Sequence, residues 1–293
     1  MKIERILVIA DQRDKQQKAL ARAKLMQEHL QVSIHVVGFC FETLDDKVTK
    51  LTAEQQQQAQ ATLMQQHQKW LQAEVDSMGF TDNVSQDVVW EKNIGHWVTA
   101  HCKDQPFDII IKTGNRSETI LYSPSDWQVL RNNQVPVLLV ADKKWRKKQT
   151  IMVTLDLATK VKSKQLLNQK LLDAGIFMSN TMGLPLHVCC SITVSPILKD
   201  LGIIDAKAIL KESKRDFIPK IKAMAGDYEI ADNHIHIKTG DPEKVIPSVA
   251  SDIAVALVIM GTVARKGLKG KVLGNTAEKV LALLKANILV IQP

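Results

Sequence analysis

The sequence has few aromatic residues and no long apolar run. Phe, Trp and Tyr make up 4% of the 293 residues, against 45% hydrophobic residues in total, so a core must be built mainly from Val, Ile and Leu. No run approaches the ~20 apolar residues that a membrane-spanning helix needs. Met1–Arg5 leads directly into a strand-like segment. We therefore expect a cytoplasmic, globular protein that does not enter a membrane.

Cysteine is also scarce, and its spacing argues against a metal motif. The chain has four cysteines, Cys40, Cys102, Cys189 and Cys190, and no C-x-x-C pair. Adjacent residues in a strand point to opposite faces, so Cys189 and Cys190 cannot share one metal ion. The pattern favours buried thiols in a reducing compartment.

Several motifs of enzymes and nucleotide-binding proteins are missing. Gly270-Lys271 is not a Walker A sequence, because Arg265 stands where that motif needs its first glycine. No G-x-G-x-x-G follows either first strand, which argues against a dinucleotide fold of the dehydrogenase kind. No nucleophile–base pair can be assigned, so we expect no enzyme. Weak ATP hydrolysis, which would lack a visible catalytic base, is the enzymatic alternative that stays open.

Histidines provide one candidate pair of metal ligands. His234 and His236 are two residues apart on an expected strand, so they would share a face. Zinc takes three or four ligands, and no third ligand can be identified near them. His96 and His101 are five residues apart, which is not the spacing of a zinc-binding helix. We therefore expect half-exposed strand histidines and no metal site.

The net charge of +8 lies wholly in the second half of the chain. Residues 1–146 contain 18 basic and 18 acidic side chains, whereas residues 147–293 contain 21 and 13. A basic half suits a phosphorylated ligand, and simple solubility explains it equally well. Because no aromatic residues are interleaved with the basic ones, we do not expect nucleic-acid binding.

Apolar runs and amphipathic stretches alternate in the same order twice. In the first copy we expect strands near residues 6–11, 34–41, 84–90, 109–111 and 136–140, with helices at 14–30, 51–78, 94–102 and from Ser123. In the second copy we expect strands near residues 151–156, 186–188, 235–237, 255–260 and 288–291. The offset of roughly 145–152 residues indicates an internal duplication. The polar, basic stretch 142–148 is the expected linker between domains at 1–143 and 149–293.

This alternation predicts an α/β fold. Each copy reads as a Rossmann-like domain, with a five-stranded parallel sheet flanked by helices and joined by right-handed crossovers. Both first strands end in an acid, Asp11 and Asp156. Ligands of open α/β sheets bind beyond the carboxyl ends of the strands, so these acids mark the edge where a site is expected.

The strongest candidate site lies after the buried run Val255–Met260. A glycine-rich basic loop, residues 261–276, leads from this strand into an amphipathic helix. Glycines let a backbone approach a ligand closely, and a helix start offers unpaired N–H groups and a dipole that favours an anion. Asn275 and Glu278 form a capping pair that places the helix start at Gly274-Asn275. A solvated turn without a ligand is the alternative, with the loop's four cations serving solubility: Arg265, Lys266, Lys269 and Lys271.

The spacing of this loop resembles that of the universal stress proteins. These proteins have, after the fourth strand, a glycine, two residues, a second glycine, nine residues, and then glycine with serine or threonine. Here Gly261, two residues, Ala264, nine residues and Gly274 keep the spacing, with Ala264 for the second glycine and Asn275 for the hydroxyl residue. The resemblance covers essentially the whole chain. It implies two tandem universal stress domains.

The resemblance also implies how the domains associate. Single-domain members of the family dimerise through their last strands, and in a tandem chain the two halves can pair with each other as an intramolecular pseudo-dimer. We therefore expect 138–140 and 289–291 to lie near a pseudo-twofold axis, and a homodimer stays open.

The resemblance further implies a ligand. Nucleotide-binding members use the acid that ends the first strand for adenosine, a second-strand backbone group for the base, and the loop for the phosphates. The implied ligand is ATP, another adenine nucleotide or a different phosphorylated molecule. The matching positions, with one loop cation, are Asp156, Val188, Met260, Gly261, Ala264, Arg265, Gly274, Asn275 and Thr276.

The first copy lacks the loop. After Ile111 the connection is three residues shorter than its counterpart and contains one glycine, Gly114. Pro124 also removes a backbone N–H from the start of the next helix, where a phosphate would need it. We therefore predict no nucleotide in this half.

Two functions of different classes follow. The first is a non-catalytic stress-response protein whose C-terminal half binds an adenine nucleotide or a related phosphorylated ligand. The alternative is a scaffold or carrier that binds no nucleotide and uses the surfaces between its halves for another small molecule or a protein partner.

Overall fold

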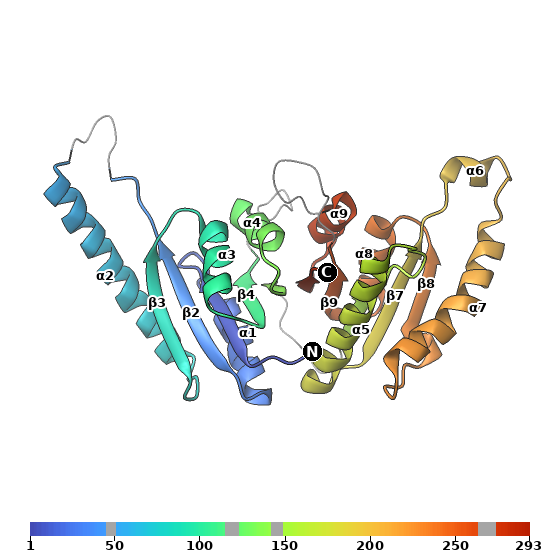
Figure 1. The fold of residues 1–293 in the computed structure, drawn as a ribbon, viewed down its shortest axis with the longest axis horizontal. Helices are drawn as coiled ribbons and strands as arrows, with labels where there is room; N and C mark the ends of the chain where they lie inside the picture. The colour runs from blue at the N-terminus through green and yellow to red at the C-terminus, as the bar shows by residue number, and fades with distance from the viewer. Residues whose placement is uncertain (45–50, 115–122, 142–148, 263–273) are drawn as a thin grey trace. The chain divides into compact units, whose positions relative to one another are not determined.

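The computed structural model of the chain describes residues 1–44, 51–114, 123–141, 149–262 and 274–293 (Figure 1). The first half contains β1 (Arg5–Ala10), α1 (Lys18–His29), β2 (Ser33–Cys40), α2 (Ala53–Ser77), β3 (Val84–Trp90), α3 (Ile94–Asp104), β4 (Ile109–Thr113), α4 (Pro124–Asn132) and β5 (Val137–Val140). The second half contains β6 (Thr150–Thr154), α5 (Lys162–Met182), β7 (Leu186–Ile192), α6 (Pro196–Asp200), α7 (Ala206–Ala225), the short 3-10 helix η1 (Asp232–His234), β8 (Ile235–Thr239), α8 (Pro242–Asp252), β9 (Val255–Gly261), α9 (Asn275–Leu283) and β10 (Asn287–Ile291).

The chain divides into two compact units. Among the described residues, one contains 3–114 and 123–140, and the other contains 1–2, 141, 149–262 and 274–293. The expected linker, residues 142–148, lies outside the described residues, so the domain boundaries at 143 and 149 stay predictions.

Both units have the same sheet topology. In the first, the strands are ordered β3-β2-β1-β4-β5, and in the second, β8-β7-β6-β9-β10; every pairing within them is parallel. The duplicated five-stranded parallel fold expected from the sequence is therefore confirmed. In each sheet the chain order reverses at the first strand, which lies between the second and the fourth. Such a switch point, at the carboxyl ends of the strands, is where open α/β sheets bind ligands.

The central strands are buried because helices cover the sheets, whereas the edge strand β3 has no buried residue. In the C-terminal unit α5 and α7 pack against each other, and Gln169 Nε2 donates to the Met224 carbonyl at 3.0 Å. Helices α8 and α9 pack against each other in the same way, with Lys279 Nζ 2.9 Å from Glu243 Oε2. All of β9 except Gly261 is buried, as expected for a central parallel strand.

The core is aliphatic, as the composition requires. Val, Ile and Leu predominate among the buried side chains, whereas long α2 buries Leu71 and Val75 and leaves most of its Gln-rich surface to solvent. Three of the four cysteines are buried, and Cys102 is half-buried, so the expectation of four buried thiols was wrong for that residue. Among the described residues, every helix is too short or too polar to cross a membrane.

Candidate functional site

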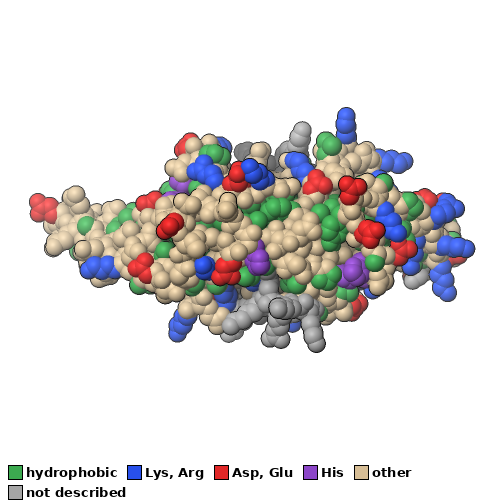
Figure 2. Space-filling model, turned by 90° about the horizontal axis from the view of Figure 1, so that it is seen from below, with side chains coloured by type: hydrophobic (Ala, Val, Ile, Leu, Met, Phe, Trp, Pro, Cys, Tyr) green, Lys and Arg blue, Asp and Glu red, His purple; other side chains and the backbone are tan. Residues whose placement is uncertain are grey.

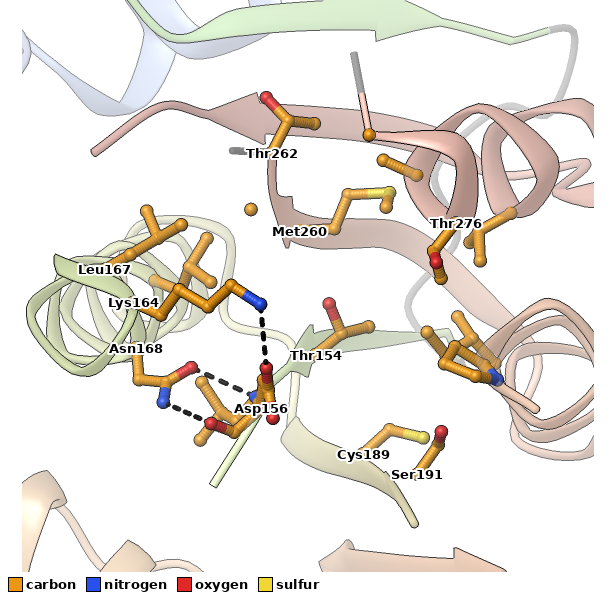
Figure 3. A pocket seen from close by; sticks show the side chains of 18 of the residues that line it. Thr154, Asp156, Lys164, Leu167, Asn168, Cys189, Ser191, Met260, Thr262 and Thr276 are labelled. Carbon is orange, nitrogen blue, oxygen red and sulfur yellow. Dashed lines mark hydrogen bonds and ion pairs between the residues drawn. The ribbon is translucent and has the colours of Figure 1, made fainter. Parts of the chain in front are cut away.

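A cavity of about 570 Å³ lies at the carboxyl ends of β6, β7 and β9 (Figure 3). It is bounded by the first turns of α5 and by the start of α9. Five of the residues singled out from the sequence line it: Asp156, Met260, Gly261, Gly274 and Thr276. The structure therefore brings together the acid after the first strand of this unit and the start of the helix after its fourth strand, although they are more than a hundred residues apart in the chain.

Asp156 is held through its backbone rather than through its carboxylate. Its N–H donates to Asn168 Oδ1 at 3.0 Å, and its carbonyl accepts from Asn168 Nδ2 at 2.8 Å. The carboxylate is thereby left to face the cavity, where Lys164 Nζ lies 3.6 Å from Oδ2 (Figure 3). Both side chains of this ion pair are exposed, so water screens their attraction and a ligand can compete for either partner.

Helix α5 supplies one wall of the cavity, which the sequence reasoning did not anticipate. Lys164, Leu167, Asn168 and Leu171 line the cavity from this helix. They are spaced as i, i+3, i+4 and i+7, so they share one helical face. That spacing was readable in the sequence. The sequence did not show that the Asn168 amide, which lies within an apolar stripe, binds the backbone of Asp156.

The Asn168 amide is expected to stabilise the fold. We expect Asn168→Ala to lower the free energy of unfolding by about 1–3 kcal/mol, because both backbone groups of Asp156 lose their partner. Urea unfolding measures the loss. Lys170→Ala, an exposed position on the same helix, is the matched control and should stay within about 0.5 kcal/mol of wild type. Equal stability of the two variants would contradict the positioning role of Asn168.

Close packing against α5 explains why residue 261 is a glycine. A Cβ atom at this position would lie 2.6 Å from Leu167 Cδ2 and 3.1 Å from Leu171 Cδ1. Real Cβ atoms essentially never approach another atom to 2.6 Å, so a side chain here would force Leu167 on α5 to shift. The first glycine of the loop motif therefore lets a helix lie directly on the end of the strand.

Helix α9 begins at the cavity without a side-chain cap. Gly274 is its N-cap residue, with φ −61° and ψ 137°, and Asn275 is the first helical residue. The expected helix start is right, but the expected Asn275–Glu278 capping pair is wrong, because the cap position belongs to glycine. The first N–H groups of a helix lack intrahelical partners and lie at the positive end of its dipole. This end of the cavity is therefore suited to an anion.

Strand β7 presents alternate residues to the cavity. Cys189 and Ser191 line it, as does Thr193 directly after the strand, whereas Val188 does not and is fully buried. The role expected for the Val188 backbone stays a prediction. Burial raises the pKa of the Cys189 thiol to about 12, so the thiol is neutral at physiological pH and is not an activated nucleophile.

Part of the expected site lies outside the described residues. Ala264 and Arg265 belong to this part, as do the other three loop cations, and the side chain of Asn275 is not described either. The described lining offers one carboxylate, one ammonium group and several hydroxyl groups, among them those of Thr154 and Thr276. Such a lining can bind a polar, hydroxylated ligand.

Three histidines form a cluster near the amino ends of β7 and β8, away from the cavity. His187 Nδ1 lies 2.9 Å from His236 Nε2, and the ring centroids of His187 and His234 are 4.0 Å apart. His234 lies in η1, so its expected place on a strand was wrong, and His187 is the neighbour that sequence reasoning missed. Figure 2 shows histidine side chains on the side of the molecule that carries the strands' amino ends. No group of three or more His, Cys, Asp or Glu in the described part of the chain is arranged to hold a metal ion.

The fold and the cavity define a class of protein: a tandem chain of two parallel α/β domains, with a ligand-sized cavity at the switch point of the second. The sequence model of the universal stress protein family matches residues 2–141 and 169–292. The chain therefore belongs to the universal stress protein family, and each half is a domain of that family.

Relatives with the same tandem length match the whole chain. It is 28% identical to a universal stress protein E homolog of Haemophilus influenzae, covering 100% of this chain and 98% of the relative. It is 25% identical to universal stress protein E of Escherichia coli K12, covering 99% and 94%. Among solved structures, a functionally unknown protein of Pseudomonas aeruginosa PAO1 matches with a TM-score of 0.72, at 24% identity and with 99% and 93% coverage. A universal stress protein of Archaeoglobus fulgidus matches with a TM-score of 0.65, at 16% identity and with 100% and 99% coverage. These two structures support the fold.

Proposed function

We propose that this chain is a non-catalytic stress-response protein whose C-terminal half binds an adenine nucleotide, with ATP as the first candidate, or a related phosphorylated molecule. The observation that carries the proposal is the cavity that joins Asp156 to the uncapped start of α9. A carboxylate can accept hydrogen bonds from ribose hydroxyls, and a helix start can hold a phosphate. Phosphate placement through Ala264, Arg265 and Asn275 belongs to the same proposal, as does contact of the Val188 backbone with the base.

The absence of a catalytic role is part of the proposal. Among the described lining residues, the thiol of Cys189 is held neutral and the Asp156 carboxylate lies beside the Lys164 ammonium group. Neither arrangement pairs a nucleophile with a base. A cytoplasmic location, pairing of the two halves and homodimerisation stay predictions from the sequence.

Gly274 is the position at which the ligand proposal is tested. We expect Gly274→Val to weaken ATP binding at least about tenfold, because a branched side chain at the N-cap would occupy space beside the first N–H groups of α9. Isothermal titration of wild type and variant measures the change, and mass spectrometry of small molecules released from the purified protein identifies a co-purified ligand.

A matched control is available at the equivalent helix of the first half. Ser123 is the N-cap of α4, where its hydroxyl accepts from the Asp126 N–H at 3.3 Å. Ser123→Ala should leave ATP affinity unchanged. An ATP affinity that is equal in wild type and Gly274→Val would refute the proposed site.

A nucleotide-free scaffold or carrier is the second candidate. The observation that favours it is a row of exposed apolar side chains that follows β7: Ile197, Leu198, Leu201 and Ile203. Contiguous exposed apolar surface is typical of protein or ligand contact sites. Purified protein that releases no phosphorylated molecule and does not bind ATP would favour this candidate over the first.

A further inference from the structure

The N-terminal half contains a buried ion pair at the position of the other half's cavity. Lys112 Nζ lies 2.6 Å from Asp126 Oδ1, and the exposed fractions of the two side chains are 2% and 0%. Charged side chains are rarely buried to this extent, and a pair is retained only where its geometry and its other hydrogen bonds offset the loss of hydration.

The strand registers show which residues of the C-terminal half are equivalent to this pair. Lys112 pairs with Leu139, the residue before the last of β5, and Met260 pairs with Val290, the residue before the last of β10. Lys112 and Met260 therefore occupy the same place at the end of the fourth strand of their domains.

The helix starts provide the second equivalence. Ser123 is the N-cap of α4 and Gly274 is the N-cap of α9. Counting three residues from each cap leads to Asp126 and Ala277. Ala277 lines the cavity, as Met260 does. An apolar pair beside the cavity in one half thus corresponds to an ion pair in the other.

Asp126 also satisfies the start of its own helix. Its Oδ2 accepts from the Ser123 N–H at 3.1 Å, and its own N–H donates to Ser123 Oγ at 3.3 Å, which forms a capping box. Lys112 Nζ also donates to the Thr113 carbonyl at 3.2 Å. A fixed negative charge therefore lies at the positive end of α4, where α9 has a glycine and no side-chain cap.

We infer that the Asp126 carboxylate is a built-in substitute for a bound phosphate, with Lys112 as its counter-ion. The N-terminal half is therefore complete without an anionic ligand, and one phosphorylated ligand binds per chain, in the C-terminal half. The inference rests on the proposed function, because it takes the cavity beside Met260 and Ala277 as the ligand site.

Chemical rescue tests this substitution in the full-length protein. Asp126→Ala removes the carboxylate and leaves the Lys112 ammonium group beside a helix start, so a small free anion should fill the vacated place. We expect formate or inorganic phosphate to raise the melting temperature of Asp126→Ala by roughly 2–4 °C more than chloride at equal ionic strength. The double variant Lys112→Met/Asp126→Ala carries the residues of the other half at these two places and lacks the Lys112 ammonium group. Its rise should equal that of wild type, in which an anion can act at the C-terminal cavity alone, and the rise of Asp126→Ala should exceed both.

The results of this anion rescue would either support or overturn the inference. A rise in Asp126→Ala that is no larger than in wild type, or an equal rise in the double variant, would overturn it. If Asp126→Ala does not fold in chloride, the yield of refolded protein in phosphate replaces the melting temperature, and an equal yield in chloride and phosphate would overturn it.

ATP titration of the same proteins separates this inference from the proposed function. One ATP per wild-type chain is expected, and two would overturn the inference. ATP binding to none of the proteins would overturn the proposed function, and the formate result would still decide whether Asp126 holds an anion's place.

Discussion

Lys112→Met is expected to lower the free energy of unfolding of the N-terminal half by about 3–5 kcal/mol. Methionine has nearly the length of lysine and is the residue at the equivalent position of the other half, so the core keeps its volume. The loss arises because Asp126, which is fully buried, loses the ammonium group 2.6 Å away. Removing one member of a buried ion pair costs far more than the pair as a whole contributes.

The double variant separates charge from packing. Lys112→Met/Asp126→Ala removes both charges, so most of the loss should be recovered, and the difference between single and double variants gives the coupling energy. Lys24→Met is the matched surface control. Lys24 lies 3.9 Å from Glu28 on α1, with both side chains partly in solvent, and its removal should change stability by less than about 0.5 kcal/mol. Urea unfolding of the four proteins makes the comparison. A double variant as unstable as Lys112→Met would show that lysine acts through packing.

The strand pattern was predictable from local sequence, because each buried parallel strand is a short apolar run between polar segments. Ile109-Ile110-Ile111 shows both the strength and the limit of that signal. It located β4 correctly, but Lys112, the next residue, also belongs to the strand and is as buried as the isoleucines. A lysine that follows an apolar run normally indicates the end of a buried strand. Its burial depends on Asp126, on a different element, which no local pattern shows.

The site was predictable to the level of elements rather than contacts. Asp156 and the Gly261–Gly274 spacing indicated the right edge of the sheet, because topology brings the carboxyl ends of parallel strands together. Asn168 was missed since its partner is the Asp156 backbone, 12 residues away in the chain, and a contact at this separation has no recognised sequence motif. The expected Asn275 cap failed by one residue, which is a common error at helix ends.

The histidine cluster shows how a duplicated position can change its chemistry. His35 and His187 are equivalent, because His35 pairs with Leu7 and His187 with Met152, and each of these partners lies four residues before the acid that follows its strand, Asp11 or Asp156. His35 Nδ1 lies 2.8 Å from Ser85 Oγ, and its Nε2 lies 3.6 Å from Asp87 Oδ2. His187 instead faces two other imidazole rings. One position therefore has an anion to stabilise its charged form, and the other does not.

Acidification from pH 6.5 towards pH 4 is expected to destabilise the C-terminal half through His187. Burial, followed by the nearby His234 and His236, lowers the pKa of His187 from 6.5 to about 4. Between these two pH values the unfolded chain binds a proton that the folded chain excludes, so stability is fully present above pH 6.5 and decreases as the pH falls. The loss from this group is about 3 kcal/mol at most. His236 adds to it in the same direction, because burial and Lys238 lower its pKa while Asp252 opposes them.

His187→Gln removes the titration and keeps a polar side chain that can donate to His236. We expect the variant to lose clearly less stability than wild type between pH 7 and pH 5, measured as urea unfolding free energies at several pH values. His35→Gln is the comparison at the equivalent position. Burial lowers the pKa of His35 too, His101 and Arg5 act in the same direction, and Asp87 opposes them, so this variant should flatten the pH profile less than His187→Gln does. Parallel profiles for wild type and His187→Gln would contradict the prediction, because they would assign the acid sensitivity to carboxylates elsewhere. Equal flattening in both variants would show that Asp87 does not protect the first domain's histidine.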